Sequence, residues 1–160
     1  MSKKPHAERS RARLAAAQAL YQMEMAGEDA GDVVSEFRSH RLGFERDSGE
    51  AEMLAEADEA LFADIVEGVV ARQVEIDKAL AGSLNPGWTL ERIDSTLRAL
   101  LRAAAFEIIA REDVPARVIL DEYVRVADAF FGDTEVGFAN GVLNGLARKT
   151  RPTEFGIPAA

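Results

Sequence analysis

The chain contains no cysteine, and this absence excludes a disulfide framework, a thiolate nucleophile and any cysteine-ligated metal site. It has two histidines, His6 and His40, which argues against a histidine-rich metal centre and against a histidine-based catalytic triad. Its longest apolar stretch, residues 99–110, is interrupted by Arg102 and Glu107, so no segment is predicted to span a membrane.

The sequence also lacks the motifs of common nucleotide-binding and catalytic sites. It contains no GxxxxGK[ST] phosphate loop, and no GxGxxG follows a predicted strand. Asp121, Glu122 and Asp128 lie on an expected helix without a neighbouring histidine, so a di-iron helix bundle would lack its Glu-x-x-His motif. Such carboxylates are typical of a solvated helix face. We therefore expect no enzymatic activity, no catalytic residue, no metal and no cofactor.

Charge is distributed unevenly along the chain. The net charge of −9 by itself argues against nucleic acid as a partner. Residues 1–13 nevertheless carry a net charge of +4, whereas residues 24–64 carry −10. This asymmetry predicts an anion-binding N-terminal end on an acidic body. No apolar segment follows the basic N-terminus, so no secretory signal is expected and the predicted location is the cytoplasm.

The residue pattern predicts an all-α protein. Of the 160 residues, 48% are hydrophobic, which is enough for one domain with its own core. Ala, Leu, Glu and Arg dominate, and no stretch shows the sustained alternation typical of strands. The expected helices span about residues 6–26, 32–41, 61–81, 90–113, 115–131 and 135–149, and an acidic loop covers residues 43–58.

A strong turn signal, Leu84-Asn85-Pro86-Gly87, divides the expected helices into two groups. We therefore expect a single domain, residues 1–160, made of two small helical bundles packed together. The first bundle covers residues 6–84 and the second covers residues 88–150. Residues 151–160 contain two prolines and are expected to form a flexible tail.

Capping residues and glycine spacing add detail to the later helices. Thr89 is expected to cap the fourth helix, and Asp133 or Thr134 the sixth. Three glycines recur at intervals of four along the sixth helix, at Gly137, Gly141 and Gly145. Because each glycine costs about 1 kcal/mol relative to alanine in a helix, this spacing predicts close backbone packing.

The basic start of the first helix is the first candidate site. Arg9 and Arg13 lie four residues apart and share a helix face, while Arg11 points elsewhere. The helix dipole disfavours cations at this end, and a guanidinium group donates to phosphates through two hydrogen bonds. The cluster therefore indicates phosphate binding, with a basic tail that aids solubility as the alternative.

The segment from Phe130 to Lys149 is the second candidate site. It contains a Phe-Gly turn and a helix start, followed by Phe138, Asn140 and Asn144. An aromatic ring beside amides near a helix start suits stacking on a base and hydrogen bonding to its edge. The alternatives are that Phe138 belongs to the core and that Asn140 bonds only to neighbouring backbone.

The fourth helix, from Ile93 to Ala110, carries apolar residues on more than one face. This pattern favours burial among other helices over an exposed surface for a partner. Trp88 lies just before this helix and fits either a core anchor or an interface residue.

At these segments the chain resembles the NusB family of bacterial transcription antitermination factors. Three stretches carry the resemblance in family order: Arg9 to Tyr21 (RSRARLAAAQALY), Leu101 to Pro115 (LRAAAFEIIAREDVP), and Phe131 to Lys149 with its FANGVLNGLARK core. It covers roughly residues 6–151. The resemblance implies an all-α, NusB-like fold of two small bundles and no enzymatic activity.

The resemblance also implies partners and site residues. NusB-like proteins bind boxA-type single-stranded RNA together with NusE, a small ribosomal subunit protein, in an antitermination complex on RNA polymerase. The family's RNA-contacting arginines map onto the basic cluster, its helix-one tyrosine onto Tyr21, and the phenylalanine of its F-x-N-G segment onto Phe138. The expected RNA-binding residues are Arg9, Arg11, Arg13, Gln18, Tyr21, Phe138, Asn140 and Lys149. The expected partner-binding residues are Tyr21, Trp88, Arg98 and Arg102.

Three features depart from the family pattern. Ser10 stands where the family's basic cluster can hold a further arginine, and the segment between Phe131 and Phe138 is one residue shorter than in some relatives. A partner-contacting acidic residue of the family aligns near Leu97, which is not acidic, so that role is not transferred.

Two other functions stay open from the sequence. NusB-like domains also form the N-terminal part of some ribosomal RNA cytosine methyltransferases, which need a further Rossmann-like domain. Because only residues 151–160 follow the last expected helix, we expect no such domain here. A self-associating helical protein, including a homodimer, is the other alternative, and it would leave the arginine cluster without a function.

Overall fold

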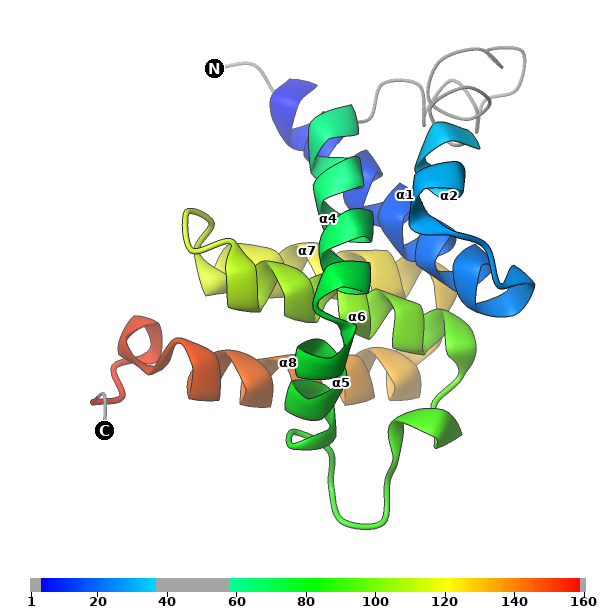
Figure 1. The fold of residues 1–160 in the computed structure, drawn as a ribbon. Helices are drawn as coiled ribbons and strands as arrows, with labels where there is room; N and C mark the ends of the chain where they lie inside the picture. The colour runs from blue at the N-terminus through cyan, green and yellow to red at the C-terminus, as the bar shows by residue number, and fades with distance from the viewer. Residues whose placement is uncertain (1–3, 37–57, 159–160) are drawn as a thin grey trace. The chain divides into compact units, whose positions relative to one another are not determined.

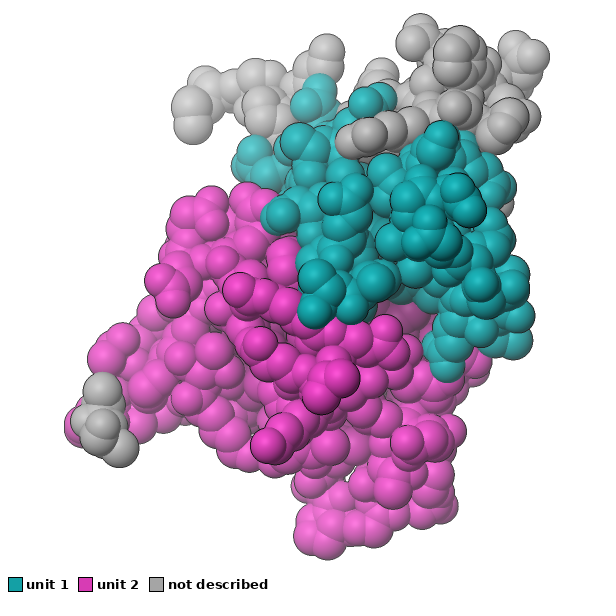
Figure 2. All heavy atoms as spheres, in the orientation of Figure 1, with its two compact units in different colours: residues 1–71 teal, residues 72–160 magenta. Residues whose placement is uncertain are grey.

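The structure is a computed structural model that describes residues 4–36 and 58–158. Within these ranges every regular element is a helix, which confirms the all-α prediction (Figure 1). The chain divides into two compact units, residues 1–71 and residues 72–160 (Figure 2).

The first unit contains three helices in its described part: α1 (Lys4–Ala26), α2 (Ala30–Glu36) and α4 (Glu59–Ala71). α1 packs against α4, and α2 contacts both. The buried surface of α1 is largely alanine, whose short side chain lets a neighbouring helix approach closely. The fully buried residues of this surface are Ala12, Ala15, Ala16 and Ala19. The apolar side chains that α4 buries include Phe62, Ile65, Val66 and Val69.

Asp58 ties the start of α4 to α1. Its Oδ1 accepts a hydrogen bond from the backbone N–H of Leu61 at 3.0 Å, and its own N–H donates to the carbonyl of Glu8 at 3.0 Å. The remainder of the acidic loop expected over residues 43–58, and the end of the helix expected over residues 32–41, lie outside the described residues.

The second unit contains four α-helices and two short 3₁₀ helices in its described part. In chain order they are α5 (Gln73–Ala81), η2 (Leu90–Arg92), α6 (Ser95–Ala110), α7 (Ala116–Phe130), α8 (Asp133–Thr150) and η3 (Pro152–Phe155). α6 contacts α5, α7 and α8, and ten of its sixteen residues are buried. Its apolar faces therefore serve the core and not an exposed partner surface.

The helix expected over residues 61–81 is broken at Arg72, whose φ of −115° and ψ of 21° depart from α-helical values. α5 consequently belongs to the second unit, where it packs on α6 and buries Ile76 and Leu80. The units divide after Ala71, and not at the Leu84–Gly87 turn as predicted. The packing of α5 decides this boundary, and the turn only links α5 to η2.

Asp94, and not Thr89, caps α6. The carboxylate of Asp94 accepts hydrogen bonds from the backbone N–H groups of Thr96 at 3.1 Å and Leu97 at 3.2 Å. Thr89 precedes η2 and makes no capping hydrogen bond through its side chain. The prediction was wrong because a separate 3₁₀ turn, Leu90–Arg92, comes between Thr89 and α6.

The start and the glycine face of α8 also differ from expectation. Gly132 occupies the N-cap position, so neither Asp133 nor Thr134 caps the helix. Gly137 and Gly141 are exposed, and a Cβ atom added at either would meet nothing within 4 Å. The predicted close backbone packing is therefore wrong at these two glycines, because their face of the helix is turned to solvent.

A buried acid–tyrosine pair lies inside the second unit. Glu107 of α6 and Tyr123 of α7 are both 0% exposed, and the Tyr123 hydroxyl donates to Glu107 Oε2. A buried carboxylate is costly unless it is hydrogen-bonded, so this contact constrains how α6 and α7 pack.

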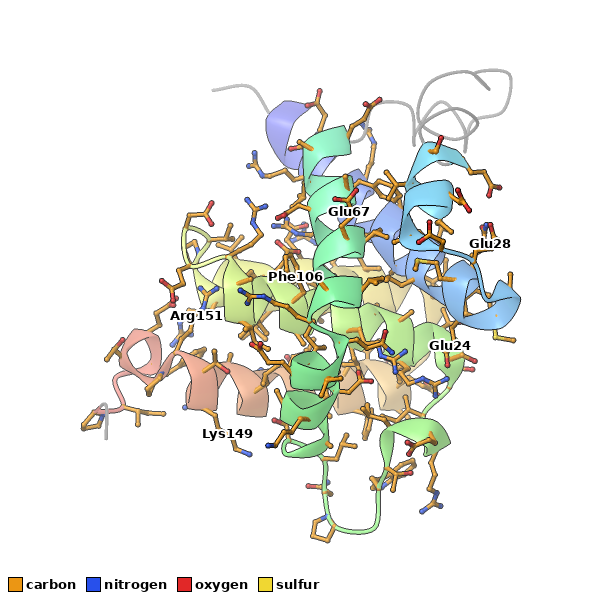
Figure 3. All side chains as sticks on the ribbon, viewed as in Figure 1. Glu24, Glu28, Glu67, Phe106, Lys149 and Arg151 are labelled. Atoms are coloured by element: carbon orange, nitrogen blue, oxygen red, sulfur yellow. The ribbon has the colours of Figure 1, made fainter. Side chains whose placement is uncertain are left out.

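Arg151 closes the C-terminal end of α6 (Figure 3). Its Nε donates to the carbonyl of Ile108 at 2.8 Å, and its Nη2 donates to the carbonyls of Glu107 at 3.0 Å and Arg111 at 2.7 Å. Its Nη1 donates to the carbonyl of Val114. Helix C-termini leave their last carbonyls short of hydrogen-bond donors, and here one buried guanidinium binds carbonyls of the last turn and C-cap of α6 and one carbonyl of the segment that follows.

The segment after α8 is held by the same arginine. Glu154 of η3 accepts from the backbone N–H of Ala116 at 2.8 Å and from Arg151 Nη1 at 3.2 Å. The Ala116 N–H and the Arg151 guanidinium lower the pKa of the Glu154 carboxyl, against the raising effect of burial. The described residues 151–158 are thus anchored, which differs from the predicted flexible tail.

We predict that Arg151→Lys lowers the free energy of unfolding by about 2–4 kcal/mol, measured by chemical denaturation followed by circular dichroism. One ammonium group cannot reach four carbonyl oxygens, and each buried acceptor left unpaired costs about 1–3 kcal/mol. Arg125→Lys on the exposed face of α7 is the control, and we expect its effect to stay within about 0.5 kcal/mol. Equal effects of the two substitutions would contradict the anchoring role of Arg151.

Candidate nucleic-acid interface

A pocket of about 250 Å³ lies within the second unit, where η2, the start of α6 and the start of α8 meet. Its wall combines aromatic and aliphatic side chains with charged groups at the rim. The lining residues are Trp88, Arg92, Ile93, Asp94, Leu97, Thr134, Glu135 and Phe138. The pocket thus brings together two residues predicted from the sequence, Trp88 and Phe138.

The two aromatic rings are in contact. The centroids of Trp88 and Phe138 are 5.6 Å apart and their planes are tilted by 50°. The Arg92 guanidinium carbon lies 5.2 Å from the centroid of the Trp88 ring, and Nη1 of Arg92 donates to the carbonyl of Gly87 at 2.8 Å. Gly87 has φ = +89°, a conformation that suits glycine and that directs the chain into this turn.

The sequence left open whether Phe138 and Trp88 belong to the core or contact a ligand or partner, and their exposure distinguishes these two possibilities. Trp88 is 44% exposed and Phe138 is half-buried, so neither ring belongs fully to the core. Part of each ring is available to a planar ligand, and the guanidinium of Arg92 supplies a positive charge beside them. Aromatic faces next to arginine suit the stacking of a single-stranded base and contact with its phosphate.

The three arginines of the predicted cluster in α1, in the first unit, differ in their exposure to solvent. Arg9 is exposed and Arg11 is half-buried, whereas Arg13 is 1% exposed and already makes an intramolecular contact. The expectation that Arg9 and Arg13 share an anion-binding face is wrong, because Arg13 lies among the buried alanines of α1. Arg9 and Arg11 stay candidates for phosphate contact.

The other first-unit candidates lie further along α1. Tyr21 is 37% exposed, so its ring is accessible. Gln18 is half-buried, and its Oε1 is buried without a hydrogen-bond donor in the described structure. These two residues belong to α1, and Trp88 and Phe138 belong to the second unit.

Two further RNA-binding candidates lie on α8. Asn140 is exposed, and its Oδ1 accepts from Nδ2 of Asn144 at 3.0 Å, which leaves the Asn140 amide donors for another group. Lys149 is exposed, and its ammonium donates to the carbonyl of Gly82 at 2.6 Å, at the end of α5 (Figure 3). Lys149 therefore has a structural contact in addition to any ligand.

The partner-binding candidates on α6 are used inside the second unit. Nη1 of Arg98 donates to the carbonyls of Leu90 at 3.0 Å and Ile93 at 2.7 Å, which holds η2 against α6. Arg102 forms a two-point ion pair with Asp77 of α5, at 2.8 and 3.0 Å. These contacts explain both arginines as structural residues, so neither is taken further as a partner-binding residue.

Sequence reasoning missed Arg92, Ile93 and Leu97 as pocket residues. Arg92 follows Trp88 by four residues, but only the 3₁₀ turn sets the guanidinium beside the indole ring. Ile93 and Leu97 read as ordinary core positions of a buried helix. No local signal distinguishes an apolar residue that lines a pocket from one that fills a core.

Metal binding and membrane insertion find no support in the described residues. Among them, no group of three or more His, Asp or Glu side chains is arranged to hold a metal ion. None of the helices in the described ranges has the length and hydropathy that a membrane span requires.

Comparison with known proteins places these features in a family. A sequence profile of the NusB family matches residues 10–148. The chain is 52% identical over 143 residues to the transcription antitermination protein NusB of Caulobacter vibrioides, covering 89% of this chain and 94% of that protein. It is 50% identical over 147 residues to the protein of that name from Maricaulis maris, covering 92% and 90%. A solved structure of T. maritima NusB matches with a TM-score of 0.73 at 25% identity, covering 92% and 96%.

We predict that Phe138→Ala lowers the free energy of unfolding by about 1–2 kcal/mol, because only part of its ring is buried. Phe106→Ala in α6 is the comparison, since Phe106 is 5% exposed and its removal is expected to cost about 3–5 kcal/mol. Both values come from denaturant unfolding under the same conditions. A cost for Phe138 equal to that for Phe106 would assign Phe138 to the core.

Proposed function

The chain belongs to the NusB family, and from this premise we propose that it binds boxA-type single-stranded RNA together with NusE, in an antitermination complex on RNA polymerase. Its role in transcription antitermination is the one for which its curated relatives are named, and that role is not catalytic. We expect this role to be carried out in the cytoplasm.

The aromatic pocket of the second unit is the observation that supports RNA binding best. Trp88 and Phe138 present partly exposed rings 5.6 Å apart, with the Arg92 guanidinium beside them. Stacking on aromatic rings is how proteins commonly hold unpaired bases, and a neighbouring arginine adds an ionic contact to the backbone. The pocket is therefore proposed to hold one base of the RNA.

Arg9 and Arg11 are proposed to contact RNA phosphates, because they are the accessible part of the basic cluster in α1. Tyr21, Gln18 and Asn140 are proposed as additional contacts through a ring, an amide oxygen and an amide donor. Arg13 is not included, because its guanidinium is buried.

A basic ribosomal partner would complement the charge of this chain. A net charge of −9 repels an RNA backbone at long range, so the chain alone is expected to bind RNA only modestly. NusE would add positive surface and further contacts to the same RNA. Tyr21 and Trp88, which are both exposed, are the proposed contacts with this partner.

We predict that boxA-type single-stranded RNA changes the fluorescence of Trp88, the only tryptophan in the chain. Phe138→Ala is expected to weaken the RNA affinity about 5- to 150-fold, which corresponds to the 1–3 kcal/mol of one base–aromatic stack. Phe130→Ala is the matched control, because Phe130 is an exposed phenylalanine outside the pocket. Equal RNA affinities of wild type and Phe138→Ala, with both proteins fully folded, would contradict the proposal that this pocket holds a base.

A second prediction concerns the partner. Saturating NusE is expected to raise the affinity for RNA, and saturating RNA is expected to raise the affinity for NusE by the same factor, because coupling between two ligands is reciprocal. Calorimetric titration of each ligand, with and without the other, measures both factors. Identical RNA affinity with and without NusE would refute cooperative assembly.

A further inference from the structure

A second cationic surface lies in the second unit, around the ring of Phe155. Phe155 belongs to η3, Arg117 to the first turn of α7 and Arg148 to the last turn of α8. The guanidinium carbons of Arg117 and Arg148 lie 5.3 and 5.0 Å from the centroid of the Phe155 ring. One aromatic ring thus gathers two arginines from different helices.

Neither of these arginines forms an ion pair or a hydrogen bond within the described residues, although both are exposed. Other arginines of the unit do: Arg72 pairs with Glu75 at 3.9 Å, and Arg125 with Glu122 at 3.8 Å. Two neighbouring like charges repel each other, and a bound anion would relieve that repulsion.

The nearby carboxylates do not supply that anion. Glu154 precedes Phe155 but is engaged by the Ala116 N–H and by Arg151. Asp121, one turn along α7 from Arg117, makes no ion pair with it. Arg117 also lies in the first turn of α7, where the helix dipole disfavours a cation.

The ring of Phe155 is held in place by the rest of the chain. Arg151 anchors the start of η3 to the end of α6, and Glu154 attaches η3 to the start of α7. Gly156, at φ = +71°, ends the turn directly after the ring. The arginine pair is therefore organised before any ligand arrives, which lowers the entropic cost of binding.

We propose that Arg117, Phe155 and Arg148 form a phosphate-binding site for the backbone of single-stranded RNA, beyond the aromatic pocket. The guanidinium groups would donate to the oxygens of a phosphodiester, a geometry that arginine suits better than lysine. This inference rests on the proposed RNA-binding function and assigns a further contact to the same ligand.

The surface of α8 supports RNA as the ligand. Phe138 and Arg148 are ten residues apart, which corresponds to about 15 Å along the helix axis. Between them α8 carries no acidic residue, and Asn140 lies exposed on the way. A strand whose base occupies the pocket therefore meets no repelling carboxylate on α8 before it reaches the arginine pair.

The test compares two double variants that remove equal charge. Arg117→Gln/Arg148→Gln removes the unpaired arginines, and Arg72→Gln/Arg125→Gln removes two exposed arginines that already have carboxylate partners. Each is titrated over a range of salt concentrations with a short boxA-type RNA and with the same RNA extended at both ends. We expect the first variant to reduce the slope of log K against log salt by about 0.7 for the extended RNA only, since the site binds one phosphodiester and each phosphate contact contributes about 0.7. The second variant is expected to match wild type with both RNAs.

Two results would overturn the site. The first is an unchanged slope with the extended RNA in the Arg117→Gln/Arg148→Gln variant. The second is an equal loss in the Arg72→Gln/Arg125→Gln variant, which would indicate a general charge effect. A titration with inorganic phosphate, followed by the side-chain NMR signals of the arginines, separates the source of the anion: a response of Arg117 and Arg148 without the slope change would assign the site to free phosphate and reject RNA.

The proposed function and this site fail in different ways. If wild type binds neither RNA, the proposed function fails and the RNA assignment of the site fails with it. If wild type binds both RNAs and Arg9→Gln/Arg11→Gln reduces the slope of log K against log salt with both, the proposed function stands. Whether Arg117 and Arg148 bind phosphate is then decided by the slope that the Arg117→Gln/Arg148→Gln variant gives with the extended RNA.

Discussion

The second unit depends on the burial of α6, a helix that is apolar on more than one face. Its contacts with three neighbouring helices supply much of the apolar burial, which is the main favourable contribution to folding. The same burial imposes a constraint, because polar groups on or at the end of α6 need partners inside the protein. Tyr123 meets Glu107, Asp77 meets Arg102, and Arg151 binds the last carbonyls of the helix. These polar contacts are thus needed because α6 is buried.

The two ends of α6 organise the two proposed RNA-binding surfaces of the unit. At the N-terminal end, Arg98 holds η2 against α6, and the aromatic pair of Trp88 and Phe138 lines the pocket there. At the C-terminal end, the hydrogen bonds of Arg151 hold η3, so that Phe155 lies against arginines from α7 and α8. Neither surface belongs to the core. Both are held in position by hydrogen bonds at the ends of the buried helix α6. This separation between a buried scaffold and partly exposed aromatic residues suits the proposed binding of RNA, because a rigid scaffold holds the contacting side chains in place.

The candidate residues that failed did so for one shared reason. The sequence shows where a charge lies along a helix, but it does not show which groups surround that charge after packing. Arg13 lies on the alanine-rich buried surface of α1, Arg98 holds η2, and Arg102 pairs with α5. The glycines of α8 were misjudged in the opposite direction, because Gly137 and Gly141 are exposed and not packed. Burial depends on the orientation of each helix against its neighbours, and that orientation is not a local property.

The sequence by itself determined the helical class, most helix ends and the resemblance to the NusB family, because propensities, glycines and prolines act within a few residues of the chain. It also identified Trp88 and Phe138 separately as candidate site residues. Only the tertiary structure decided that these two rings touch, that the units divide after Ala71, and that Arg151 anchors the C-terminal segment. These outcomes join segments far apart in the sequence, and the free energy of such contacts comes from the packing of whole helices.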